Sequence, residues 1–149
     1  MRAKDIMRSN VISVKQEDRI EDIVSTLMKN HISGVPVTNQ QNQVIGIVTE
    51  KDLITRDRGL NISSYMEFVA SILFIDGKLQ KELHHKIEAQ TANDIMSSPV
   101  YAVYLDTTLE EVASVMINRR INRIPVINKN NELLGIIGRS DLLPTLINK

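Results

Sequence analysis

The chain has 149 residues, of which 18 are Lys or Arg and 18 are Asp or Glu, and it contains no cysteine. A net charge of zero gives no overall field that attracts nucleic acid or an anionic membrane, and a chain without thiols forms neither disulfides nor thiolate zinc sites. No apolar run approaches the roughly 20 residues of a membrane-spanning helix, and no signal-peptide pattern follows Met1. We therefore expect a soluble cytoplasmic protein that binds neither nucleic acid nor membrane.

The sequence is a tandem duplication. Adding 89 to a residue number between 3 and 54 gives its counterpart between 92 and 143, and 18 of these 52 positions are identical without a gap. The stretch GIVTEKDL at 46–53, for example, corresponds to GIIGRSDL at 135–142. Repeats of this kind share a core with each other. We expect one repeat at 1–58, a connecting segment at 59–91 and a second repeat at 92–149.

Each repeat predicts the element order strand, helix, strand, strand, helix. Runs rich in Val and Ile predict strands at 11–14, 35–37 and 44–48 in the first repeat and at 100–103, 124–127 and 133–137 in the second. The strands at 44–48 and 133–137 are continuously apolar, which is typical of strands buried on both faces. The expected fold is mixed α/β (α+β), with two repeats packed sheet to sheet in pseudo-twofold symmetry.

Capping-box spacing predicts where the first helix of each repeat begins. Asp18 stands three residues before Glu21, and Thr107 stands three residues before Glu110. Apolar residues at helical spacing follow in both repeats. A further helix is expected to start near Asp52 and near Asp141.

The connecting segment belongs to neither repeat. Apolar spacing from Tyr65 to Leu73 and a turn at Asp76-Gly77 predict a helical insertion. It covers the core ends in one interpretation and contacts a second subunit or a larger partner in the other.

No catalytic or metal-binding pattern is present in the sequence. It lacks the glycine-rich phosphate loops, and its histidines are His31 and the adjacent pair His84 and His85. Adjacent positions on a helix diverge by roughly 100°, so this pair does not face one metal ion. We expect no enzyme activity and no metal.

Thr49 and Asp52 at the end of GIVTEKDL allow two interpretations. As a helix cap, Thr49 accepts a hydrogen bond from the third amide and Asp52 is favourable in the first turn. As a ligand site, the carboxylate accepts hydrogen bonds from the vicinal hydroxyls of a ribose. Physical reasoning alone leaves both open.

The duplicated pattern resembles a known family. Asp-Ile-Met, Val-Pro-Val and Gly-Ile-Val-Thr-Glu-Lys-Asp-Leu, each followed by its second copy, are similar to two cystathionine-beta-synthase (CBS) domains in tandem, a Bateman module of the standalone bacterial type. The resemblance implies a regulatory module that binds an adenosyl ligand, such as AMP, ADP, ATP, S-adenosylmethionine or NAD, in clefts between the repeats. It implies no required cofactor, a homodimer and an effector protein as partner. The alternative is a structural dimerisation module without a small ligand.

The resemblance also implies two sets of ligand-binding residues. The first site is expected to consist of Val11, Ile12, Val35, Pro36, Thr49 and Asp52, with Arg123 of the second repeat reaching a phosphate. The second is expected to consist of Val100, Tyr101, Ile124, Pro125, Ser140 and Asp141, with Lys51 reaching it from the first repeat. Gly138 stands where the family pattern has a hydroxyl, so the first site is expected to bind more tightly. Arg119 and Arg120 are expected to be solvated cations at a helix end.

Overall fold

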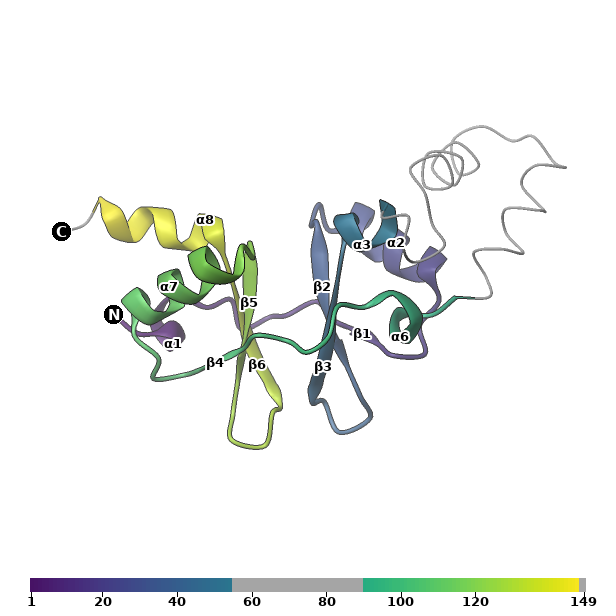
Figure 1. The fold of residues 1–149 in the computed structure, drawn as a ribbon, viewed down its shortest axis with the longest axis horizontal. Helices are drawn as coiled ribbons and strands as arrows, with labels where there is room; N and C mark the ends of the chain where they lie inside the picture. The colour runs from purple at the N-terminus through teal and green to yellow at the C-terminus, as the bar shows by residue number, and fades with distance from the viewer. Residues whose placement is uncertain (55–89, 148–149) are drawn as a thin grey trace, which may run out of the picture. The chain divides into compact units, whose positions relative to one another are not determined.

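A computed structural model of the chain describes residues 1–54 and 90–147 (Figure 1). The helical insertion expected within 59–91 therefore lies almost entirely outside the described residues. In the part of the chain that is described, no helix is both long and apolar enough to cross a membrane.

The described residues form the same series of elements twice. The first repeat has α1 (Ala3–Ile6), β1 (Val14–Lys15), α2 (Ile20–Lys29), β2 (Gly34–Thr38), β3 (Val44–Thr49) and α3 (Glu50–Ile54). The second has α6 (Ala92–Ile95), β4 (Val103–Tyr104), α7 (Leu109–Arg119), β5 (Arg123–Ile127), β6 (Leu133–Gly138) and α8 (Arg139–Leu142), followed by the 3-10 helix η2 (Leu143–Leu146). The sheets have the orders β1-β2-β3 and β4-β5-β6. The mixed α/β fold predicted from the duplication is confirmed.

Strand pairing in the second sheet follows from the connections. β4 and β5 are parallel, with α7 as the crossover between them, whereas β5 and β6 are antiparallel and joined by a short turn. In β3 and β6 only Gly46, Val48, Gly135 and Ile137 are buried, and their neighbours are half-buried. The expectation that these strands are buried on both faces was therefore wrong for one face.

The opening strands are shorter than the sequence predicted. β1 begins at Val14 and β4 at Val103, and residues 11–13 and 100–102 have no regular structure. Val14 and Val103 are buried, whereas Ile12 is exposed at the surface. Only the last apolar residue of each run reaches the core, so the run as a whole does not extend the sheet.

The residues that cap the starts of α2 and α7 were predicted one position too early in the chain. In α7 the capping box joins Thr108 and Glu111: the Glu111 carboxylate accepts from the Thr108 backbone N–H at 2.9 Å, and the Thr108 hydroxyl accepts from the Glu111 N–H at 3.3 Å. Thr107 instead accepts from the backbone N–H of Tyr104 at 3.0 Å and closes the turn before the helix. Two threonines and two glutamates in succession fit the spacing in either register, which explains the error.

The first repeat shows the same shift. α2 begins at Ile20, after the non-helical residue Arg19, so Asp18 is not its cap. The Asp18 carboxylate accepts from the backbone N–H of Lys15 at 2.9 Å. Asp18 therefore closes the turn before α2, as Thr107 closes the equivalent turn before α7.

The structure divides into two compact units that interleave the repeats. We call residues 1–12, 38–45 and 99–149 the Asp141 unit, and residues 13–37 and 46–98 the Asp52 unit. α1 joins the second repeat through hydrogen bonds such as Ala3 N–H to the Thr107 carbonyl at 2.8 Å. α6 joins the first repeat in the same way, from Ala92 N–H to the Asp18 carbonyl at 2.8 Å. Each repeat therefore completes its core with the opening helix of the other.

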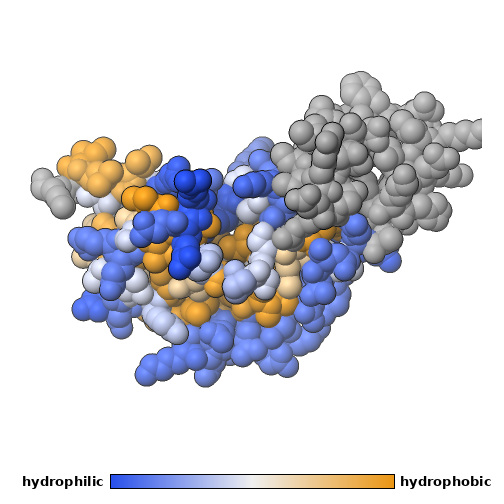
Figure 2. Space-filling view, viewed as in Figure 1, coloured by the Kyte–Doolittle hydropathy of each residue, from blue (hydrophilic) through white to orange (hydrophobic). Residues whose placement is uncertain are grey.

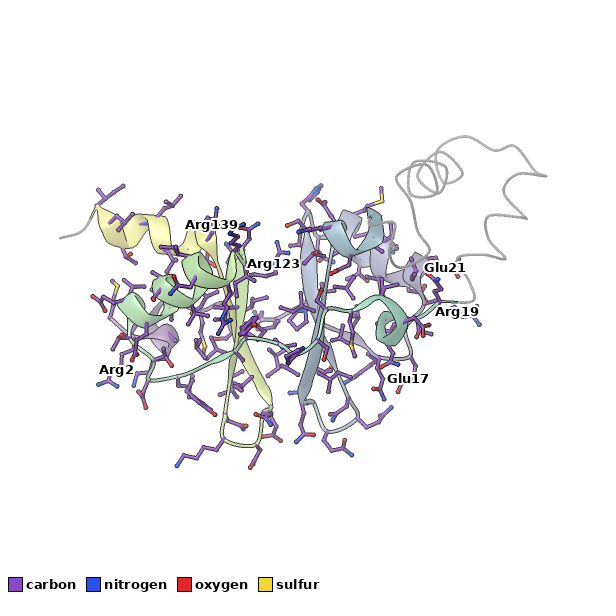
Figure 3. All side chains as sticks on the ribbon, in the orientation of Figure 1. Arg2, Glu17, Arg19, Glu21, Arg123 and Arg139 are labelled. Atoms are coloured by element: carbon purple, nitrogen blue, oxygen red, sulfur yellow. The ribbon has the colours of Figure 1, made fainter. Side chains whose placement is uncertain are left out.

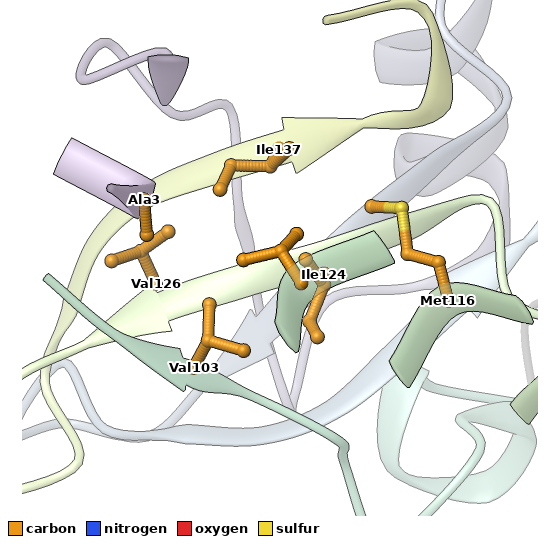
Figure 4. Packing of buried hydrophobic residues seen from close by; sticks show 7 residues of the cluster. Ala3, Val103, Met116, Ile124, Val126 and Ile137 are labelled. Carbon is orange, nitrogen blue, oxygen red and sulfur yellow. The ribbon is translucent and has the colours of Figure 1, made fainter. Parts of the chain in front are cut away.

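The core of the Asp141 unit shows this exchange directly (Figure 4). Its buried cluster consists of Ala3, Val103, Val112, Met116, Ile124, Val126 and Ile137. Ala3 comes from α1 and is fully buried, and its counterpart Ala92 is fully buried in the Asp52 unit. The exchanged helices are thus part of the core.

Candidate functional site

Asp52 lies in the first turn of α3, directly after β3, and is 8% exposed. Its Oδ2 accepts hydrogen bonds from the backbone N–H of Thr49 at 2.8 Å and from the Thr49 hydroxyl at 3.1 Å. Its Oδ1 accepts from the Ser97 hydroxyl at 2.8 Å. Asp52 itself therefore caps the start of α3. Thr49 is the donor in this contact, whereas it was expected to be the acceptor. Each of these three donors is a neutral group.

Asp141 occupies the corresponding place after β6, and one of its partners is charged. Its Oδ2 accepts from the backbone N–H of Gly138 at 2.7 Å, as Asp52 does from Thr49. Its Oδ1 accepts from two nitrogens of Arg8, Nε at 3.0 Å and Nη2 at 2.7 Å. The Asp141 side chain is 14% exposed and that of Arg8 64%. The two motif aspartates therefore differ in these hydrogen-bond donors as well as in the missing hydroxyl at position 138.

Arg8 and Ser97 are equivalent residues of the duplication, since they lie 89 positions apart. Arg8 exchanges backbone hydrogen bonds with Ile136, at 2.9 and 3.1 Å, and Ser97 exchanges them with Ile47, at 2.8 and 3.2 Å. The backbone therefore positions both side chains in the same way, and only the side chain differs. Sequence reasoning missed both residues, although the shift of 89 aligns Arg8 with Ser97 in an otherwise identical Asp-Ile-Met context.

The glycines that open both motif copies accommodate methionine side chains. A Cβ at Gly46 would clash with Sδ, Cγ and Cβ of Met96, and a Cβ at Gly135 would meet the same atoms of Met7. These methionines directly follow the exchanged helices α6 and α1. Both glycines thus allow the exchanged segments to lie close to β3 and β6.

The remaining residues expected in the first site fall in both units. Val35 and Pro36 lie buried in β2 and belong to the Asp52 unit together with Thr49. Val11 and Ile12 belong to the Asp141 unit. Lys51 belongs to the Asp52 unit, where it is exposed on α3.

The residues expected in the second site, apart from Lys51, all lie in the Asp141 unit. Ile124 and Pro125 are buried in β5, Val100 is half-buried, and Ser140 is exposed on α8. Tyr101 is 41% exposed, and the guanidinium of Arg119 lies over its ring, 4.5 Å from the centroid. Arg119 therefore stacks on an aromatic ring, which the expectation of a solvated cation did not include.

Arg123 begins β5 and is opposite Gly138 in the strand register. It is half-buried, and Figure 3 shows it beside Arg139 at the start of α8. Both arginines thus lie at the end of the second sheet where β6 ends and α8 begins. The expected role of Arg123 towards a phosphate stays a prediction.

Residues 1–54 and 90–147 contain no group of three or more His, Asp or Glu side chains that could hold a metal ion. A pocket of about 480 Å³ lies between α2 and α3, with Leu27, His31 and Leu53 among its lining residues, and neither Thr49 nor Asp52 lines it. The motif carboxylates therefore remain the candidate ligand groups.

Comparison with known proteins agrees with this architecture. The family model for the CBS domain matches residues 3–59 and 92–148. An uncharacterised protein of Methanocaldococcus jannaschii, MJ1426, is 29% identical over 156 residues, which cover 99% of this chain and 92% of the relative. Other relatives are longer: the chain spans 59% of MK0525 of Methanopyrus kandleri and 58% of the chloroplastic CBSX2 of Arabidopsis thaliana.

Solved structures share the fold over almost the whole chain. The structure of CBSX2 in complex with AMP has a TM-score of 0.75 at 22% identity, and it covers 99% of this chain and 97% of its own. The CBS domain pair of protein MJ0100, in complex with 5-methylthioadenosine and S-adenosylmethionine, has a TM-score of 0.71 at 20% identity, covering 99% and 97%. With the family model matching both repeats, the chain belongs to the CBS domain family and carries two copies of the domain.

Proposed function

We propose that this chain is a regulatory module that binds an adenosyl ligand through Asp52 and performs no catalysis itself. The observation that carries the proposal is the Asp52 carboxylate, which is buried and held at the end of β3 by the neutral donors of Thr49 and Ser97. An ionised carboxylate accepts several hydrogen bonds at once, and the two vicinal hydroxyls of a ribose are donors at a suitable spacing. AMP in CBSX2 and S-adenosylmethionine in MJ0100 support this ligand class.

The surroundings of Asp52 suit a nucleoside. Val35 and Pro36 of β2, which the family resemblance associates with the base, belong to the same unit as Asp52. The absence of cysteine fits a reducing compartment, and we place the module in the cytoplasm. Its output passes to an effector protein that senses the bound state.

A thermal-shift panel tests the proposal. AMP, ADP, ATP, S-adenosylmethionine and NAD are added separately at millimolar concentration to the purified protein. A ligand at about 100 times its dissociation constant adds about 2.7 kcal/mol to the free energy of unfolding, which raises the melting midpoint by several degrees. The shift should disappear in Asp52→Ala. A panel without any shift would favour the alternative, a structural module without a small ligand.

One observation supports the alternative, a structural module without a small ligand. Four apolar side chains at the end of α7 and in the C-terminal elements are strongly exposed: Ile117 (72%), Leu143 (58%), Leu146 (71%) and Ile147 (82%). Figure 2 shows apolar side chains gathered over the C-terminal elements. Exposed apolar groups of this kind often contact a second chain. We propose a homodimer through these residues, which is compatible with either function, and light scattering at tens of micromolar protein measures it.

A further inference from the structure

We infer that Arg8 closes the second site by occupying the Asp141 carboxylate, so that the module offers one nucleoside site, at Asp52, rather than two. This inference rests on the proposed function of the motif aspartates. It adds that one residue outside the motif decides whether the Asp141 carboxylate is covered by a guanidinium.

The contact itself is a charge-assisted pair on a single oxygen. Arg8 donates from Nε and Nη2 to Oδ1 of Asp141, and the Gly138 N–H donates to Oδ2. Both carboxylate oxygens are thus engaged, and one of them is covered by a guanidinium. Ribose hydroxyls that approach Asp141 must displace a cation, whereas at Asp52 the equivalent position holds a serine hydroxyl.

The duplication provides an internal comparison. Arg8 and Ser97 are fixed by the same pair of backbone hydrogen bonds, to Ile136 and to Ile47. The aspartates also accept the same backbone amide, from residue 138 and from residue 49. Because the two surroundings share this framework, exchange of serine for arginine is the change that covers the second carboxylate with a cation.

A second guanidinium in the same unit points the same way. Arg119 lies over the ring of Tyr101, which is the aromatic group that the family resemblance associates with the base in the second site. A base that stacks on this face of Tyr101 must displace Arg119. The carboxylate and the aromatic ring that are expected to recognise a nucleoside in the Asp141 unit are therefore each in contact with an arginine of the chain itself.

Isothermal titration calorimetry of the full chain with AMP and with adenosine tests the inference. We expect one site in the wild-type protein and two in Arg8→Ser, which gives position 8 the same side chain as position 97. The reciprocal variant Ser97→Arg should weaken binding at Asp52 at least tenfold. Adenosine, which has no phosphate, separates closure by Arg8 from a role of Arg8 as a phosphate ligand.

Arg2→Ser is the matched control, because Arg2 is an exposed arginine in the same segment that pairs with Asp106. It should keep one site. Circular dichroism and the melting midpoint show whether each variant folds, and Ser97→Arg retains the test if Arg8→Ser does not fold.

The outcomes separate the two proposals. A folded Arg8→Ser protein that gains no site, also when it is combined with Arg119→Ala, overturns the closure by Arg8, as does weaker AMP binding in Arg8→Ser. A wild-type protein without binding, combined with one new site in Arg8→Ser, supports the closure and overturns the proposed function at Asp52. Unchanged affinity in a folded Ser97→Arg variant also overturns the closure.

Discussion

Ser97 donates a hydrogen bond of 2.8 Å to Oδ1 of Asp52 over a separation of 45 residues. Ser97 follows the exchanged helix α6, so the segment that completes the core of the first repeat also contributes to its carboxylate site. A substitution at the site therefore affects two properties, ligand affinity and the seating of the exchanged segment. Ligand affinity and stability are therefore measured separately for each variant.

Replacement of Asp52 by asparagine should reduce affinity for AMP far more than the same replacement at Asp141. A hydrogen bond to a charged acceptor contributes about 1.5–3 kcal/mol, which corresponds to a ten- to hundredfold change in dissociation constant. The introduced amide retains one oxygen acceptor for Thr49 but loses the acceptor for Ser97, so the melting midpoint should fall as well. Calorimetry on both variants measures the difference. Equal losses in Asp52→Asn and Asp141→Asn would contradict a single working site.

Gly46→Ala should destabilise the fold through Met96, without any ligand present. The added Cβ has no room beside the methionine side chain, and overpacking of this kind costs about 1–3 kcal/mol. Urea titration measures the free energy of unfolding. Gly138→Ala is the control, because its Cβ meets Asp141 Oδ2 at 3.3 Å and no methionine. If Gly46→Ala is as stable as the wild type, the Met96 side chain moves aside and accommodates the added methyl group.

Thr108→Ala should lower the stability of the Asp141 unit by about 1 kcal/mol, the usual contribution of an N-cap. The Thr108 hydroxyl and the Glu111 carboxylate satisfy each other's backbone N–H groups at the start of α7. Thr108→Ser, which keeps the hydroxyl, is the matched control and should retain most of the stability. A loss as large in Thr108→Ser would show that packing of the methyl group, rather than the cap, is responsible.

The protein should lose stability in acid, in part because of Asp106. The hydrogen bond and charge of Lys4, together with Arg2, hold the pKa of this carboxyl below its usual range in the folded protein. The backbone and hydroxyl of Thr108 likewise lower the pKa of Glu111. A lowered folded-state pKa means that the stabilisation is present above about pH 4 and is lost as the pH falls further.

Urea midpoints at pH 7 and pH 3 check this prediction. Asp106→Asn removes the titrating group, so its midpoint should fall less than that of the wild type between the two pH values. Asp5→Asn, next to Lys4 in the chain, tests whether another exposed carboxylate has the same effect. An identical pH dependence in the wild type and Asp106→Asn would show that the contact with Lys4 contributes no net stability.

The sequence predicted α2, β2 and β3 and their counterparts α7, β5 and β6 because their features are local, whereas the opening helices α1 and α6 were not predicted. Apolar periodicity defines α2 and α7, and a continuous apolar run followed by Asp-Leu defines the end of each repeat. Thr107 and Thr108 both fit the capping-box spacing, so the local pattern alone does not identify the residue that caps α7. Only the structure distinguishes which threonine closes the turn and which caps the helix.

The exchange of α1 and α6 was not predictable from the sequence. Ala3-Lys4-Asp5-Ile6 and Ala92-Asn93-Asp94-Ile95 have nearly the same pattern, so either helix fits either core. The partners of Asp52 and Asp141 depend on this exchange, because Ser97 and Arg8 follow the exchanged helices. The motif identified the carboxylates, but the residues that distinguish them are set by contacts distant in sequence.

The exchange of opening helices also has a consequence during protein synthesis. Arg8 leaves the ribosome long before Ile136 and Asp141, the residues that bind its backbone and side chain. α1 therefore has no complete core to pack against until the last strand of the second repeat has been synthesised. Contacts between such distant segments form late in folding. Folding intermediates of this chain should therefore expose the residues around β6 that α1 covers in the native state, and a chaperone that binds apolar strands would act on them at that stage.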